Sequence, residues 1–143
     1  MTSYIGFDWF ESGYDEELIS KAKDFILKHY YSDLDFLRKL PYYHETDEYV
    51  FIHAGINPDF KNWKETNADE MIWIREQFLN SDHSHPQTFI HGHTPNVNLH
   101  GIHDIFFANK KIGIDGACAY GGQLNCLEIK DGAYKQYHIN KIN

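Results

Sequence analysis

The spacing of apolar residues predicts two helices in the first third of the chain. Over residues 15–31 apolar side chains recur every three or four positions, as on one face of an amphipathic helix. A second, shorter helix is expected over "DLDFLRKL", with Ser32 or Asp33 as its N-cap and its end before Pro41. Residues 1–48 are therefore predicted to be mainly helical.

Residues 49–143 carry mainly strand patterns. "EYVFIHAG" contains an unbroken apolar run that predicts a strand covered on both faces. "TFIHGH" predicts a short strand that ends on histidines, and "IFFANKKIGID" predicts two strands, the second ending at Asp115. "QLNCLEIKDGAYKQYHI" has the pattern of a β-hairpin around a Lys-Asp-Gly turn.

One more helix is expected between these strands. "NADEMIWIREQFL" carries apolar residues at helical spacing, and Asn67 with Glu70 predicts a capping box. Helices and strands thus alternate along the chain, which is typical of an α/β (α+β) fold in a single domain over residues 1–143.

Composition limits the function classes. The 143 residues carry a formal net charge of -8, which disfavours binding to nucleic acids and to anionic membranes. The N-terminus has no signal-peptide pattern, and the chain has no apolar run of membrane-spanning length. Cys118 and Cys126 match neither a metal nor a disulfide pattern, so we expect reduced, packed thiols and a cytoplasmic protein.

Three histidines follow predicted strands next to glycines. His53 ends the first strand, and His91 and His93 end the second, in the stretch "FIHGHTP". Ligands of open α/β sheets gather at the carboxyl ends of strands, and neutral imidazole binds Zn, Mn or Fe. The placement of all three favours a metal site, although any one of these histidines alone is more often an ordinary turn residue.

The remaining polar residues of interest divide into two groups. Arg75 falls on the apolar stripe of its predicted helix, so its guanidinium either extends past the edge of the core or binds a phosphate. Four other histidines lie in polar stretches and are expected to be solvated loop residues: His83, His85, His100 and His103.

Five segments in order resemble the C-terminal half of the phosphoprotein phosphatase family of metallophosphoesterases: "FLRKLPYY", "YVFIHAGINP", "MIWIREQF", "FIHGHTP" and "IGIDGACAYGGQLNCLEI". The resemblance covers residues 33–130. It includes bacterial and phage Ser/Thr protein phosphatases and symmetrical diadenosine tetraphosphatases. It implies a hydrolase with part of a calcineurin-like β-sandwich flanked by helices, two divalent metal ions (Mn, Fe or Zn), and a phosphoprotein or nucleotide phosphoester as substrate.

The resemblance also implies roles for individual residues. His53 and His93 correspond to ligands of one metal ion, and Arg75 corresponds to the catalytic arginine that binds the substrate phosphate. His91 corresponds to no ligand and is expected to support the site or its turn. Asp115 corresponds to an aspartate at a strand end, where a structural role is expected.

The motifs of the family's first half do not occur in this sequence. The chain has no Gly-Asp and no Gly-Asn dipeptide, and its one His-Glu pair, His44-Glu45, lies in a predicted polar loop. The bridging aspartate, the other metal's ligands and the catalytic acid are therefore missing. We expect an incomplete domain with weak or no activity alone, and association as a homodimer or with the missing half.

Two alternatives stay open. One is a non-catalytic pseudo-phosphatase module that binds phosphate or a partner around Arg75. The other is an assembly of two chains joined by zinc through His91, His93 and the loop histidines.

Overall fold

The computed structural model describes residues 15–140 together with Tyr4, Gly6 and Gly13. The chain divides into two compact units, residues 1–41 and residues 42–143. The boundary between the units, at residues 41 and 42, comes earlier in the chain than the predicted change from helix to strand at residues 48 and 49. No helix in the described part of the chain is both long enough and apolar enough to cross a bilayer.

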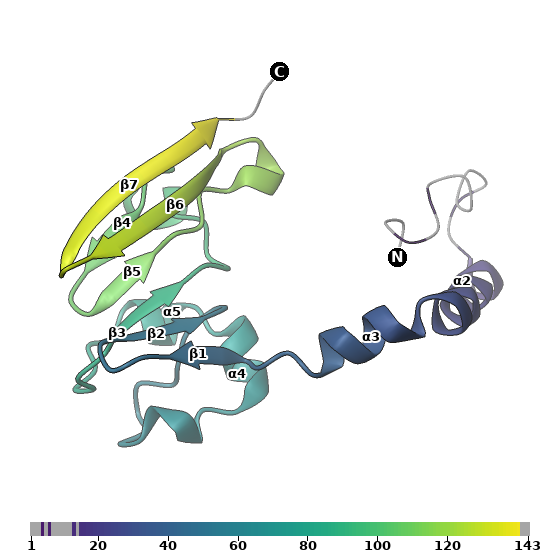
Figure 1. Ribbon diagram of the computed structural model, residues 1–143, viewed down its shortest axis with the longest axis horizontal. Helices are drawn as coiled ribbons and strands as arrows, with labels where there is room; N and C mark the ends of the chain where they lie inside the picture. The colour runs from purple at the N-terminus through teal and green to yellow at the C-terminus, as the bar shows by residue number, and fades with distance from the viewer. Residues whose placement is uncertain (1–3, 5, 7–12, 14, 141–143) are drawn as a thin grey trace. The chain divides into compact units, whose positions relative to one another are not determined.

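The first unit contains helices α2 (Glu16–His29) and α3 (Tyr31–Arg38), as Figure 1 shows. The Asp15 carboxylate caps α2 by accepting a hydrogen bond from the Leu18 N–H at 2.7 Å. The prediction of a Ser32 or Asp33 cap for the second helix is wrong. The Tyr30 carbonyl accepts the first backbone hydrogen bonds of α3, so the helix begins earlier and has no side-chain cap.

A five-stranded sheet forms the centre of the second unit. Its strands are β1 (Tyr43–Glu45), β2 (Tyr49–Ile52), β3 (Thr88–His91), β4 (Phe106–Ala108) and β5 (Lys111–Gly113). They lie in the order β1-β2-β3-β5-β4, with β2, β3 and β5 parallel to one another and the two edge strands antiparallel to their neighbours. The mixed α/β class predicted from the sequence is confirmed. The predicted polar loop at His44-Glu45 is wrong, because these residues form edge strand β1.

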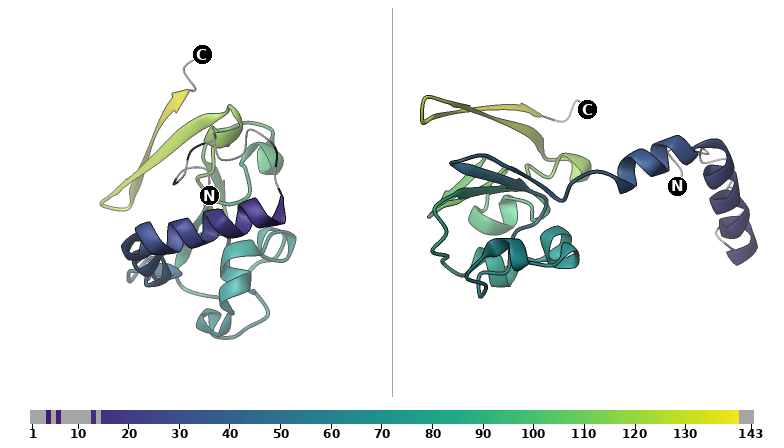
Figure 2. Two further views of the ribbon diagram at one scale, coloured as in Figure 1. Left: turned by 90° about the vertical axis from the view of Figure 1, so that its right-hand side faces the viewer. Right: turned by 60° about the horizontal axis from the view of Figure 1, so that its bottom comes forward.

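Strands β6 (Gln123–Lys130) and β7 (Ala133–Asn140) form the predicted hairpin. Its turn residues Asp131 and Gly132 have φ of 50° and 75°, which a right-handed twisted hairpin requires of a two-residue turn. The hairpin covers one face of the five-stranded sheet (Figure 2), where Leu127 and Ile129 pack against that sheet's buried isoleucines.

Short helices cover the opposite face of the sheet (Figure 2). They are the 3-10 helix η2 (Trp63–Glu65), α4 (Ala68–Trp73) and α5 (Glu76–Leu79). The largest core cluster lies between this layer and the sheet, and it consists of Val50, Ile52, Ile56, Trp63, Met71, Phe78 and Phe89. The capping box of Asn67 and Glu70 is confirmed at the start of α4.

Three further expectations differ from the structure. The helix expected over "NADEMIWIREQFL" breaks into α4 and α5, because Ile74 and Arg75 leave the helical conformation. Phe51 of β2 is 38% exposed, so that strand is covered fully on one face only. Cys118 and Cys126 are free but exposed, so the prediction of packed thiols is wrong.

Candidate functional site

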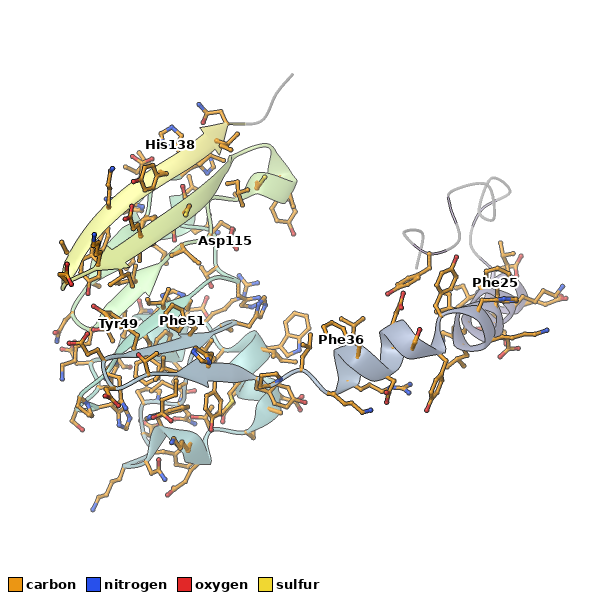
Figure 3. The ribbon with its side chains drawn as sticks, viewed as in Figure 1. Phe25, Phe36, Tyr49, Phe51, Asp115 and His138 are labelled. Carbon is orange, nitrogen blue, oxygen red and sulfur yellow. The ribbon has the colours of Figure 1, made fainter. Side chains whose placement is uncertain are left out.

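The carboxyl ends of the parallel strands bring the predicted site residues to one edge of the sheet. Ile52 pairs with His91, and His91 pairs with Gly113, so all three strands end at the same level. The segments that leave these ends carry His53, His93 and Asp115, the last of which is labelled in Figure 3. This common edge is the candidate site.

His53 and His93 lie side by side. Their ring centroids are 5.0 Å apart, with 55° between the ring planes. The two loops are joined by a hydrogen bond from the Gly92 N–H to the His53 carbonyl at 2.9 Å. The edge of Trp73 meets the His93 ring with a centroid distance of 5.5 Å. The structure therefore brings together two of the predicted metal ligands, from separate strands, beside an exposed indole.

His93 has an unusual conformation and an unusual environment. Its φ of 64° is in the left-handed region, which is costly for a side chain with a Cβ and is concentrated at functional sites. Burial lowers the pKa of His93, and the charges of Arg75 and His53 lower it further, although a hydrogen bond to the Trp73 backbone and the charge of Asp115 oppose them. Its Nε2 atom is buried without a hydrogen-bond partner. A neutral ring with a free nitrogen can bind a cation.

Arg75 occupies the break between α4 and α5. Its φ of -132° and ψ of -99° are not helical, and its carbonyl accepts the first hydrogen bonds of α5. The side chain is exposed, and its charge acts on His93. The predicted position on a continuous apolar stripe is wrong. The alternative of a guanidinium directed toward the site agrees with this electrostatic contact.

His91 is a core residue beneath the candidate site. It is 1% exposed, and its ring meets Phe78 edge-to-face at 5.3 Å. Its Nδ1 lies 3.3 Å from the Gly92 carbonyl, which can only accept, so this nitrogen carries the proton. Burial lowers the pKa of His91 to about 4. A neutral His91 therefore holds the peptide that precedes His93.

Asp115 and Asn96 fix the turn that follows β5. The Asp115 carboxylate accepts the Ala117 N–H at 2.9 Å, and its carbonyl accepts the Asn96 N–H at 2.8 Å. The Asn96 amide donates in turn to the carbonyls of Asp104 and Gly113. Asn96 is fully buried. Sequence reasoning missed it, although an asparagine directly after a Thr-Pro turn is a known signal for local hydrogen bonding.

The histidines expected in solvent do not all lie there. His85 is 6% exposed, and His83 stacks on it with ring centroids 5.4 Å apart. Burial lowers the pKa of His83 to about 4 and also lowers the pKa of His85. The prediction of solvated loop histidines is wrong for these two because Phe89 packs against both rings. It is also wrong for His103, which is half-buried and has its Nδ1 shielded from solvent. His100 is exposed, as predicted.

Trp73 and a polar pocket beside Arg75 were also missed. Trp73 is 67% exposed and contacts the His93 ring, and an exposed tryptophan is itself a signal of a binding surface. The pocket has a volume of about 270 Å³ and is lined by Arg75, Glu76, Leu79, Asn80, Thr94, Asn98 and Leu99. No sequence pattern unites these residues, since they come from two separate segments of the chain, 75–80 and 94–99.

The donor set is smaller than that of a complete metal centre. Among the described residues, no group of three or more His, Cys, Asp or Glu side chains is arranged to hold a metal ion. Comparisons of the chain with protein-family models, with curated proteins and with solved structures found no match. The function therefore has to be inferred from the geometry of this edge and from the sequence resemblance.

Proposed function

We propose that this chain provides part of the active site of a metal-dependent phosphoester hydrolase related to Ser/Thr protein phosphatases. The observation that carries the proposal is the contact between His53 and His93 at the ends of two adjacent parallel strands. The layering of helices, mixed sheet and hairpin supports a calcineurin-like β-sandwich as the fold, with this chain forming part of it.

The geometry of the two imidazoles fits a shared cation. Ring nitrogens bind zinc at about 2.0–2.1 Å, and at tetrahedral angles this holds two ring centroids roughly 5 Å apart. The observed separation is 5.0 Å. The Nε2 of His93 is buried without a hydrogen-bond partner and is therefore available to a cation. One ring nitrogen in each of His83, His85, His91 and His103 is in the same state, so the contact with His53 is what singles out His93. His53 and His93 would therefore hold one divalent ion, such as Mn, Fe or Zn.

Each residue of the site then has a definite task. A bound divalent ion supplies Lewis-acid stabilisation of the phosphate oxygens and a nucleophilic hydroxide. Arg75 binds phosphate oxygens through its planar fork, which matches a tetrahedral anion in a bidentate contact. Its positive charge also lowers the pKa of His93, in addition to the larger effect of burial. His91 and Asp115 hold the loops in place.

A second function, phosphate binding without turnover, is favoured by one observation. Two imidazoles are fewer than the three protein ligands of typical catalytic zinc sites, and the described residues provide no third ligand. We therefore expect the chain alone to bind divalent metal weakly and to hydrolyse phosphoesters slowly or not at all. A missing half or a second copy would have to complete the two-metal site.

Metal binding at the two histidines tests the proposal. Zinc titrated into the full chain should shift the imidazole NMR signals of His53 and His93 together, and His53→Ala or His93→Ala should abolish the shift at the other ring. His100→Ala, at an exposed histidine, is the matched control and should change neither signal. Independent responses of the two rings would contradict the proposal.

An aryl-phosphate assay with added manganese separates the two functions. Inorganic phosphate should bind to the native chain. Its affinity should fall in Arg75→Ala and stay unchanged in the control Arg38→Ala. Turnover of the chain alone at about 1–10³ s⁻¹, the usual enzyme range, would show that the site is complete without further ligands.

A further inference from the structure

The pocket beside Arg75 is a separate feature from the histidine pair. It lies between α5, the loop that follows β3, and α6 (Val97–His100). Thr94, which follows His93 directly, contributes to its wall, so the pocket and the candidate metal site are neighbours. A volume of about 270 Å³ is slightly below the range of pockets for drug-sized ligands, roughly 300–1,000 Å³. Its occupant must be small.

The pocket has a charge of each sign at its wall. Arg75 and Glu76 are adjacent in sequence and both line it. Within the described residues, neither side chain takes part in an ion pair. A ligand with both an anionic and a cationic group would satisfy both residues at once.

Two asparagines of the lining have free hydrogen-bonding capacity. The side chains of Asn80 and Asn98 belong to exposed residues and have no hydrogen bond to another described residue. Leu79 and Leu99 supply the only large apolar contacts, and no aromatic ring lines the pocket. A nucleobase would therefore have no ring to stack on, while a short amino alcohol would find both amide and carboxylate partners.

We propose that this pocket is the subsite for the alcohol part of the phosphoester, and that Glu76 selects phosphomonoesters whose alcohol part carries a protonated amine. The inference rests on the proposed function, because Arg75 must bind the phosphate for the alcohol part to reach the pocket. The amine then pairs with Glu76, and the amides of Asn80 and Asn98 bind the polar atoms between the two charges.

Phosphoethanolamine and propyl phosphate form a matched pair of probes. They have the same length and differ only in that an ammonium group replaces a methyl group, so their affinity ratio isolates the contact with Glu76. In an NMR titration of the full chain, phosphoethanolamine should bind up to about fivefold more tightly at low salt, the upper range for exposed charge pairs. Both probes should shift the amide signals of Arg75 and Thr94, and phosphoethanolamine should also shift those of Asn80 and Asn98.

Glu76→Gln should reduce the ratio of the two dissociation constants to about one. Glu65→Gln removes the same charge from an exposed position outside the pocket and should keep the ratio. Equal affinities in the native chain, or a preference that survives Glu76→Gln, would overturn the subsite while leaving phosphate binding at Arg75 intact. If neither probe nor inorganic phosphate binds at Arg75, the proposed function and the subsite both fail.

Discussion

The two faces of the five-stranded sheet are closed in different ways. On the helix face, aromatic and aliphatic side chains from β2, β3, α4 and α5 form one cluster whose members are at most 7% exposed. On the hairpin face, three isoleucines are buried, and the outer side of the hairpin is open to solvent. That outer side carries apolar residues, including Leu124 and Ile139 at 58% and 66% exposed.

This difference indicates which side holds the candidate site in place. The loop that follows β2 is tied to α4 by a hydrogen bond from the Ala54 N–H to the Met71 carbonyl. The Asn57 amide donates to Glu70 on the same helix at 2.6 Å. The site residues are thus anchored through the helix face. Substitutions there should affect both stability and the site, whereas substitutions on the outer hairpin should affect neither strongly.

The largest expected effect comes from the aromatic core of the helix face. Phe89 is fully buried against Trp63 and Phe78, so Phe89→Ala should lower the free energy of unfolding by about 3–5 kcal/mol. Phe51, on the neighbouring strand but 38% exposed, is the matched control, and Phe51→Ala should cost about 1 kcal/mol. Urea denaturation measures both. Similar losses at the two positions would show that the faces are equally closed.

A buried lysine gives the next largest effect. Lys111 is 4% exposed, and its ammonium donates to the carbonyls of Phe78, Leu79 and Ser81 at the end of α5. Lys111→Met keeps the aliphatic stem but leaves these carbonyls unpaired, which should cost about 2–3 kcal/mol. Lys135→Met, on the exposed hairpin, should change stability by less than about 0.5 kcal/mol. Equal effects in urea denaturation would mean that the buried ammonium does not hold α5.

How far the sequence predicted these features depends on the range of the interactions. The hairpin was predicted correctly because its Asp131-Gly132 turn is a local signal. The capping box of Asn67 and Glu70 is local as well. The burial of Lys111 could not be predicted, since its carbonyl partners lie about thirty residues earlier in the chain. A charged residue in a strand pattern indicates exposure unless such partners exist.

The candidate site shows the same limit. The alignment of His53 and His93 was predictable from parallel strands that end at one level. The break at Arg75 was not, because helical periodicity continues through "MIWIREQF" and only tertiary hydrogen bonds, such as that of Ala54 to Met71, compete with it. The polar pocket could not be expected either, because it joins residues 75–80 with residues 94–99.

Acid should lower the stability of the chain through a histidine that packs on the helix face. Burial lowers the pKa of His83 from 6.5 to about 4, so the unfolded chain binds more protons between these values and stability falls as pH drops from 6.5 to 4. His85, Lys110 and Lys111 face His83 and also disfavour its protonated form, whereas its hydrogen bond to the Lys110 backbone opposes the shift.

His83 is only partly buried, so its contribution to the loss of unfolding free energy between pH 6.5 and 4 should be about 1–2 kcal/mol. This is less than the full change in its pKa implies. The measurement is urea denaturation at several pH values. His83→Phe should remove the His83 part of the dependence and leave the part due to His91, whose pKa burial also lowers to about 4. His138→Gln on the exposed hairpin is the control that should keep the whole dependence. A native chain whose stability is constant between pH 6.5 and 4 would contradict the contribution of these histidines.

The smallest effect is expected at the hairpin turn. Gly132 has a φ of 75°, and a Cβ added there meets no atom within 4 Å, so only backbone strain opposes a side chain. Gly132→Ala should therefore cost about 1 kcal/mol, and Gly132→Asn should cost less because asparagine tolerates the left-handed region. Gly55 on the helix face differs, since a Cβ there would lie 2.3 Å from the Phe78 ring. Thermal unfolding of Gly132→Ala and Gly55→Ala should give a much lower Tm for the second, and equal Tm values would mean that Phe78 can move aside and that the helix face is no more rigid than the hairpin.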